Sequence, residues 1–159
     1  MNEEVKILKA SFYDLEDILK LQKTAFLSEA EYYNNYNIEP LTQTFDSIAA
    51  DFNDFIFLKA VSINNIIGSV KARETGEYCW VGKLIVAPEF QNRGIGRKLL
   101  TEIENEFPST KQYVLCTGSK SSKNIKLYES VGYKIQEVFN DEGHANLELV
   151  RMIKENIRK

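Results

Sequence analysis

The stretch QNRGIGRKLL, residues 91–100, brings two glycines and two arginines together just before an apolar periodic run. In that run apolar side chains recur every four positions, at Ile95, Leu99, Ile103 and Phe107. This spacing predicts the buried face of a helix, which Pro108 ends because proline cannot continue the helical hydrogen-bond ladder. The preceding segment EYCWVGKLIV, residues 77–86, predicts a strand, so the glycine turn joins a strand to a helix.

The two glycines have a direct physical use at the start of a helix. The first helical turn exposes unpaired N–H groups and carries partial positive charge. Gly94 and Gly96 lack a β-carbon, so a ligand can approach this backbone closely, and Arg93 and Arg97 can add charge. The turn is therefore suited to a pyrophosphate group; a helix start whose glycines only allow tight packing is the alternative.

Apolar periodicity outside this stretch predicts an α+β fold. Strands are expected over residues 5–10, 55–63, 66–73, 77–86 and 112–118, then over YKIQEVF and LELVRMI near the end. Helices are expected after residue 14, from residue 42, from residue 95 and from residue 121 or 122. The two-residue turns Asn64-Asn65 and Thr75-Gly76 would make the three middle strands an antiparallel meander. The resulting fold is one domain over residues 1–159, a mixed, mostly antiparallel sheet of about seven strands flanked by about four helices.

Composition narrows the class of protein. The chain has 159 residues, 43% of them hydrophobic, and a formal net charge of -3, which argues against a general nucleic-acid binder. Cys79 and Cys116 both lie in apolar runs and are expected to be buried free thiols rather than a disulfide or a metal pair. Apolar runs stay short of the about 20 residues of a membrane span, and the first residues are acidic, unlike a signal peptide. We expect a soluble, cytoplasmic protein without a metal.

Two common phosphate-binding motifs do not fit the glycine turn. The dinucleotide fingerprint needs a third glycine, where Leu99 stands, and an acidic residue at the end of the next strand. That strand ends instead in Cys116, Thr117 and Gly118. The P-loop needs Gly-Lys-Ser/Thr, which is absent from this turn.

A third motif fits both the turn and the rest of the chain. The run LIVAPEFQNRGIGRKLLTEIE, residues 84–104, resembles the acetyl-CoA motif of the GNAT superfamily of N-acetyltransferases, a strand ending in V-x-P followed by Gln/Arg-x-x-Gly-x-Gly/Ala. The family's second block is similar to VLCTGSKSSKNIKLYESVGYKI, residues 114–135, with Asn124, Leu127 and Tyr128 in order before Gly132. The expected elements also match the family's order across nearly the whole chain.

This resemblance implies a set of residues that bind acetyl-CoA as the acetyl donor. Backbone amides from Gln91 to Arg97 would hold the pyrophosphate, and the end of the preceding strand would pair with the pantetheine arm like an added strand. Asn124 would reach the same arm through its side-chain amide; an exposed helix asparagine is the alternative. The full set is Leu84, Ile85, Val86, Gln91, Asn92, Arg93, Gly94, Ile95, Gly96, Arg97, Asn124 and Tyr128.

The family's direct mechanism needs a neutral amine and a proton donor for the leaving thiolate. A lysine-type amine has a pKa of ~10.4, so it must lose a proton before it attacks. Tyr128 matches the family's tyrosine acid; an aromatic side chain that packs on the sheet is the alternative. The strand residues 79–87 contain no carboxylate, which leaves Glu77 at the strand's start as the nearest candidate base. Other candidates are Glu29, Glu31, His144 and a chain of water molecules.

The segment LSEAEYYNNYNIEPL, residues 27–41, is expected to form a loop or a broken helix. By resemblance, this is where the fold builds its acceptor site, and aromatic faces with carboxylates suit a cationic amine. The candidate acceptor residues are Glu29, Glu31, Tyr32 and Tyr33, with Tyr36 and Glu39 nearby. A surface loop that packs on the sheet or on a second subunit is the alternative.

The sequence therefore predicts an acetyl-CoA-dependent N-acetyltransferase that moves an acetyl group to a primary amine. The acceptor would be a small molecule, a peptide or a protein, and not a nucleic acid or a membrane. A non-catalytic module that senses acyl-CoA or binds a partner on the same fold is the alternative, favoured by the missing strand carboxylate. A nicotinamide or nucleotide enzyme ranks last. A homodimer would agree with the sheet-edge dimers that occur in the family.

Overall fold

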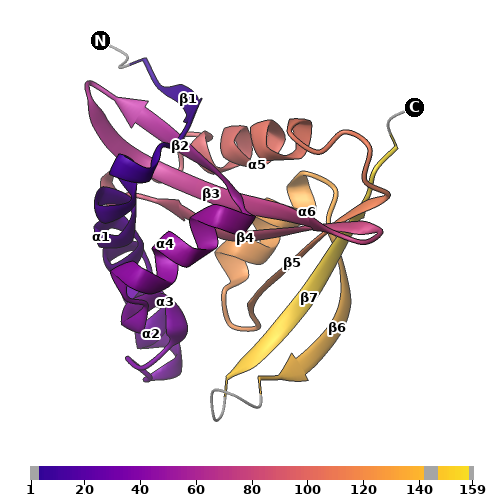
Figure 1. The fold of residues 1–159 in the computed structure, drawn as a ribbon. Helices are drawn as coiled ribbons and strands as arrows, with labels where there is room; N and C mark the ends of the chain where they lie inside the picture. The colour runs from indigo at the N-terminus through magenta and orange to yellow at the C-terminus, as the bar shows by residue number, and fades with distance from the viewer. Residues whose placement is uncertain (1–3, 142–146, 158–159) are drawn as a thin grey trace.

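The computed structural model describes residues 4–141 and 147–157 as a mixed α+β fold (Figure 1). One seven-stranded sheet has the order β1-β2-β3-β4-β5-β7-β6, antiparallel except between β4 and β5. Its strands are β1 Lys6–Lys9, β2 Ile56–Ser62, β3 Asn65–Thr75, β4 Tyr78–Val86, β5 Gln112–Gly118, β6 Lys134–Asn140 and β7 Glu148–Glu155. The predicted fold class, sheet and parallel crossover are confirmed.

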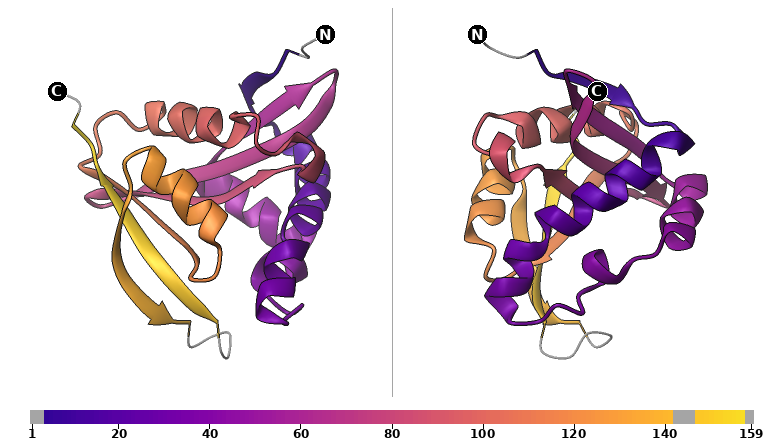
Figure 2. Two further views of the ribbon diagram at one scale, coloured as in Figure 1. Left: turned by 180° about the vertical axis from the view of Figure 1, so that it is seen from behind. Right: turned by 90° about the vertical axis from the view of Figure 1, so that its left-hand side faces the viewer.

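Helices cover both faces of the sheet. Four of those described have nine or more residues: α1 Leu15–Ala25, α4 Phe45–Asp54, α5 Ile95–Asn105 and α6 Ser122–Ser130. Two shorter ones, α2 Leu27–Tyr33 and α3 Glu39–Thr42, lie between α1 and α4, and short 3-10 turns occupy Phe12–Asp14 and Pro88–Phe90. In Figure 2 (right), α5 and α6 lie on one side of the sheet and α4 on the other.

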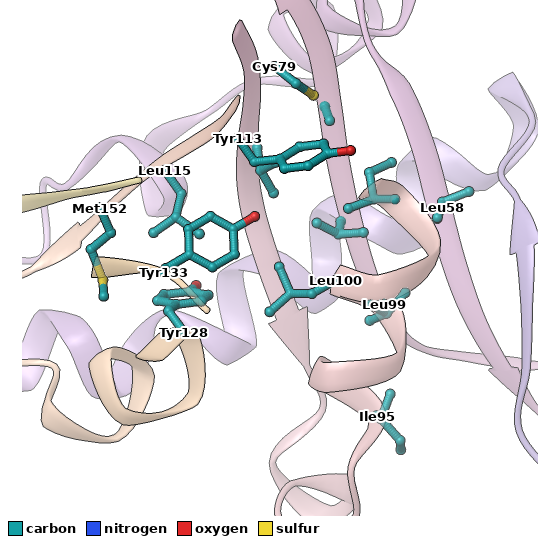
Figure 3. Packing of buried hydrophobic residues seen from close by; sticks show 14 of the residues in the cluster. Leu58, Cys79, Ile95, Leu99, Leu100, Tyr113, Leu115, Tyr128, Tyr133 and Met152 are labelled. Atoms are coloured by element: carbon teal, nitrogen blue, oxygen red, sulfur yellow. The ribbon is translucent and has the colours of Figure 1, made fainter. Parts of the chain in front are cut away.

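The larger core lies between the sheet and the helices α5 and α6. Ile95, Leu99, Leu100 and Ile103 of α5 are buried in it, as the four-residue spacing predicted for this helix. From α6 the ring of Tyr128 packs edge-on against Tyr133, 6.1 Å between centroids, and the two are neighbours in Figure 3. A smaller core joins α1 and α4 to β2 on the opposite face.

A buried carboxylate ties α5 to the C-terminal part of the sheet. Glu104 is only 4% exposed, and it accepts hydrogen bonds from the Tyr133 hydroxyl at 2.9 Å and from the Lys154 ammonium at 2.7 Å. Its backbone carbonyl accepts a further bond from the Tyr113 hydroxyl at 3.1 Å. One side chain therefore holds a helix, a loop and the strand β7 together.

The segment between α1 and α4 is a broken helix, one of the two predicted forms. α2 ends at Asn34, whose φ of 48° lies in the left-handed region that asparagine tolerates better than most residues. α3 begins with Pro40 in its first turn, where the missing N–H costs nothing. These two short helices both contact α1, and both contribute residues to the site described below.

Both predicted meander turns are displaced by one residue. Ser62 pairs with Asn65, so the β2–β3 turn consists of Ile63 and Asn64, with φ values of 46° and 64°. Thr75 pairs with Tyr78, so the next turn consists of Gly76 and Glu77. A β-branched residue such as Ile63 is disfavoured at positive φ, and strand pairing overrides that local preference.

The strands β4 and β5 separate soon after they pair, and this separation positions the site. Their parallel pairing covers only Tyr78–Trp80 opposite Gln112–Val114. Farther along β4, Lys83 and Leu84 lie opposite the single residue Val70 of β3, and Lys83 has a φ of 49°. Such a bulge bends a strand and increases its twist. In Figure 2 (left) the strands β6 and β7 diverge from the plane of β2 and β3.

Two further features bear on the sequence-based expectations. Cys79 is buried and Cys116 is half-buried, and both are free thiols. Among residues 4–141 and 147–157, the helices are too short or too polar to cross a membrane.

Replacing Glu104 by glutamine is expected to lower the free energy of unfolding by about 1–3 kcal/mol. The buried hydrogen bonds from Tyr133 and Lys154 lose their charged acceptor, and such bonds contribute about that much. Urea denaturation of the variant and of wild type measures the difference. Glu102→Gln, on the exposed face of the same helix, is the control and should stay within about 0.5 kcal/mol. Equal midpoints for all three proteins would contradict this role of Glu104.

Candidate active site

A cavity of about 940 Å³ opens where β4 and β5 separate. It is lined by the start of α5 and by α6 on one side, and by α2, α3 and the start of α4 on the other. The predicted donor-binding and acceptor-binding segments, far apart in the sequence, therefore face the same cavity. All of the predicted donor residues except Arg93 line it: Leu84, Ile85, Val86, Gln91, Asn92, Gly94, Ile95, Gly96, Arg97, Asn124 and Tyr128.

The glycine turn presents backbone amides to this cavity. Asn92 and Gly94 have positive φ values of 66° and 82°. The helical ladder of α5 starts with the bond from the Lys98 amide to the Gly94 carbonyl at 3.1 Å, so the earlier amides have no helical acceptor. A β-carbon added at Gly94 would meet no atom within 4 Å, whereas one at Gly96 would lie 3.2 Å from Leu127. Gly94 thus leaves the approach to the first turn open, and Gly96 lets α6 pack closely.

Basic side chains surround the turn, and they differ in part from the predicted set. Arg97 lines the cavity and donates a hydrogen bond to the Ser130 hydroxyl at 3.0 Å. Arg93 does not line it; its guanidinium lies 5.0 Å from the centroid of the Phe90 ring. Lys123 and Lys126 of α6 also line the cavity, and the sequence analysis did not predict either of them. The sequence pattern that could have identified them is their three-residue spacing, which places both on one face of the helix beside Leu127.

Tyr128 reaches the cavity from the middle of α6. Its side chain is 7% exposed, and burial raises the pKa of its hydroxyl well above the usual value of about 10, with a further rise from the nearby charge of Glu29. The phenol therefore stays protonated across the physiological range. A protonated hydroxyl at this place can donate a proton to a group held in the cavity.

Glu29 reaches the cavity from α2 and is held by residues at the start of α6. The Asn124 side-chain amide donates to Oε1 at 3.0 Å, and the Ser121 hydroxyl donates to Oε2. Burial raises the pKa of the Glu29 carboxyl, and the bond from Ser121 offsets part of that rise. Next to this contact, the Tyr33 hydroxyl accepts a bond from the Lys120 amide at 2.8 Å. Helix α2 is thereby joined to the β5–α6 turn.

A network of charged and amide side chains forms the far wall of the cavity, on the α3 and α4 side. Lys83 lies 2.7 Å from a Glu39 carboxylate oxygen, and Lys71 lies 2.7 Å from an Asp51 carboxylate oxygen. Gln43 joins the two pairs, accepting from Lys83 at 3.1 Å and donating to Asp51 at 2.8 Å. Burial alone would raise the pKa of Asp51, but the hydrogen bond and charge of Lys71 hold it below the usual range.

Besides Arg93, two predicted site residues lie away from the cavity. Glu77 precedes β4 in an exposed turn, its carboxylate 3.1 Å from the Lys111 ammonium, and does not line the cavity. Glu31 is exposed on α2 and does not line it either, whereas Tyr32 and Tyr33 do. We therefore do not retain Glu77 as a base or Glu31 as an acceptor residue.

Other candidate groups around the site give no metal centre. His144 lies outside the described residues. Within residues 4–141 and 147–157, no three His, Cys, Asp or Glu side chains are grouped so that they could hold a metal ion.

A mixed sheet whose parallel central strands separate beside a glycine-rich helix start defines the acetyltransferase class of fold. The family model described as Acetyltransferase (GNAT) family matches residues 15–133. The chain belongs to this family, as the resemblance of its two motif blocks predicted. No curated protein sequence matches the chain significantly.

Solved structures share the fold at low sequence identity. The PaiA N-acetyltransferase from Thermoplasma acidophilum in complex with coenzyme A is 20% identical, with a TM-score of 0.75 over 96% of this chain and 99% of that one. The ribosomal-protein-alanine N-acetyltransferase from Escherichia coli is 14% identical, with a TM-score of 0.78 over 96% and 94%. A spermidine N-acetyltransferase chimera of Vibrio cholerae SpeG and hSSAT is 20% identical, with a TM-score of 0.74 over 96% and 95%.

Substitutions at Gly94 test whether the turn binds an anion. Gly94→Glu is expected to weaken binding of coenzyme A about 100-fold or more, because like charges brought together cost several kcal/mol. Gly94→Ala is the control, since it shares the backbone strain of the 82° φ and adds no charge. Isothermal titration calorimetry measures both affinities. If both variants lose affinity equally, the turn does not act through charge on a pyrophosphate.

Proposed function

We propose that the protein is an acetyl-CoA-dependent N-acetyltransferase that moves an acetyl group to a primary amine by direct attack on the thioester. The observation that carries the proposal is the single cavity that joins the open glycine turn, the buried Tyr128 and the carboxylate of Glu29. A donor bound at one end and an amine at the other would meet at Tyr128.

On the donor side, the residues present fit coenzyme A. The turn offers free amides, the Gly94 position leaves room, and Arg97, Lys123 and Lys126 supply positive charge. The inner edge of β4 from Leu84 to Val86 has lost its β5 partner, so its backbone groups can pair with an extended arm. Acetyl-CoA supplies the activated acetyl group as a thioester.

On the acceptor side, Glu29, Tyr32 and Tyr33 of α2 would surround the amine. A half-buried carboxylate attracts a cation, and aromatic faces add to that attraction. The acceptor would be a small molecule, a peptide or a protein that presents a primary amine. The solved relatives include enzymes named for a ribosomal-protein alanine and for spermidine, so the fold accommodates both kinds.

Tyr128 would act as the general acid. As nitrogen attacks the carbonyl carbon, the C–S bond breaks and the thiolate takes the phenolic proton. The raised pKa of Tyr128 keeps the phenol protonated at neutral pH, so the proton is present when the reaction starts.

One observation favours the second candidate function, a module that binds acyl-CoA without transferring it. Within β4 the cavity is lined by Lys83 rather than by a carboxylate, and Glu77 lies outside the cavity. Acetyl-CoA binding with no thiol release on addition of spermidine, glucosamine or a peptide with a free N-terminus would support that candidate. Amine-stimulated thiol release would exclude it.

Replacing Tyr128 by phenylalanine is expected to lower kcat by about 10²–10⁴-fold, the range for loss of a general acid. The affinity for acetyl-CoA should stay within about twofold, because the ring and its packing on Tyr133 remain. Thiol-release kinetics and calorimetry measure the two quantities. Tyr36→Phe, at an exposed position outside the cavity, is the control. Unchanged turnover in Tyr128→Phe would show that the proton comes from elsewhere.

A further inference from the structure

Four carboxylates line the cavity in the described part of the chain: Glu29, Glu39, Asp51 and Asp141. A carboxylate that faces the cavity is a candidate to take the proton of an acceptor ammonium. Glu39 and Asp51 each lie 2.7 Å from a lysine ammonium, and the charge of Lys71 depresses the pKa of Asp51. Carboxylates bound to a cation in this way are weak bases. Asp141 follows β6, and β7 separates that strand from β5 and the Tyr128 end of the cavity.

Glu29 differs from these residues in the groups that hold it. Its two oxygens accept from the neutral donors Asn124 and Ser121, so no cation competes with a proton for them. The side chain is half-buried, and its partner Asn124 lies four residues before Tyr128 on α6, on the same face of that helix. It therefore stands beside the general acid, on the wall that the acceptor would approach.

From this geometry we infer that Glu29 is the catalytic base that takes the proton from the acceptor ammonium. The inference rests on the proposed acetyltransferase function and adds to it the residue that activates the amine. The burial-raised pKa of the Glu29 carboxyl agrees with this role, because a base is most effective when its pKa lies near the working pH.

The proton balance of the reaction is complete with these two residues. Glu29 takes one proton from the ammonium, which leaves a neutral amine, and later releases that proton to solvent. The amine lone pair forms the N–C bond, and the C–S electron pair leaves with sulfur. Sulfur takes the proton of Tyr128, and the second proton lost by nitrogen restores the phenol. The net products are the N-acetylated amine, coenzyme A and one proton.

Asn124 has a positioning role in this arrangement. Its side-chain nitrogen donates to Glu29 at 3.0 Å, which leaves its side-chain oxygen as an acceptor for the pantetheine arm. One residue would thus contact both the base and the donor. Because the carboxylate is held between α2 and α6, its place depends on the contact between these helices.

The decisive variant is Glu29→Gln, which keeps the shape and an oxygen that can accept from Asn124. We expect kcat at pH 7 to fall about 10²–10³-fold, with acetyl-CoA affinity within about threefold of wild type. The control is Glu31→Gln on the same helix, which removes the same charge at an exposed position outside the cavity. Rates are measured as thiol release with the best of spermidine, glucosamine and an alanine-terminated peptide.

The pH dependence separates a base from a binding charge. Without a base the variant needs an amine that is already neutral, so the wild-type to Glu29→Gln ratio of kcat should fall about tenfold per pH unit between pH 7 and 9. Both proteins share the other titratable groups around Glu29. These groups are Tyr128, Lys123 and Lys126 on α6, Tyr32 and Tyr33 on α2, and Lys120 in the β5–α6 turn. Loss of the Glu29 charge lowers the pKa of Tyr128, but burial, the larger cause, still holds that pKa above its usual value and so above the range of pH 7 to 9.

The kinetic results distinguish failure of the Glu29 assignment from failure of the proposed function. A raised KM with kcat unchanged, or a kcat ratio that stays constant with pH, would overturn the assignment of Glu29 as the base while leaving the transferase intact. Absence of amine-stimulated thiol release from wild type itself would overturn the proposed function, and the assignment with it. A large fall in kcat with Glu31→Gln would show that charge on α2, and not contact with the acceptor, accounts for the effect.

Discussion

The separation of β4 from β5 is the constraint on which the site depends. Only three residues of each strand pair, and beyond Trp80 the inner edge of β4 faces the cavity while its outer edge stays paired with β3. Backbone groups at such an edge need hydrogen-bond partners. The Gln91 side chain satisfies the Val86 carbonyl at 3.1 Å, and the neighbouring groups remain open to an extended ligand. The bulge at Lys83 occurs where this edge becomes available.

The same separation explains why the glycine turn and Tyr128 face one cavity. α5 begins just after β4 ends, and α6 follows the end of β5, so the two helix starts flank the opening from opposite strands. The approach of α6 to α5 is close because a side chain at Gly96 would press on Leu127. Packing between these two helices therefore fixes the distance between the glycine turn and the Tyr128 hydroxyl.

Sequence reasoning predicted the fold well because the fold depends on local patterns, and the residues predicted for the donor side form a local motif that lies mostly along the cavity. Four-residue apolar spacing identified α5, alternation identified the strands, and the motif around Gly94 lies in one continuous stretch. The turn at Ile63 was misplaced because asparagine and glycine preferences suggested a later turn, while cross-strand pairing set the register. Lys123 and Lys126 were missed because a short helix shows little about which face meets a ligand.

The acceptor side was harder to predict because its contacts join residues distant in sequence. Glu77 lies in the turn that precedes β4, and because strands rise about 3.3 Å per residue it lies about 23 Å from Leu84. Glu29 meets Asn124, 95 residues away, across a cavity that exists only in the folded chain. The sequence shows how many carboxylates the segment 27–41 contains. It does not show which of these side chains point into the cavity.

The cavity carboxylates differ in the side chains that bind them, and this difference separates carboxylates held in ion pairs from one whose charge is not neutralised. Glu39 and Asp51 with Lys83 and Lys71 form a wall in which each negative charge has a positive one beside it, joined by Gln43. That wall holds α3 and α4 against the sheet and leaves no net charge to attract an amine. Within residues 4–141 and 147–157, the partners of Glu29 are the neutral side chains of Asn124 and Ser121, so its charge remains available to the cavity. The proposed cationic acceptor would therefore be drawn to the wall where α2 meets the start of α6.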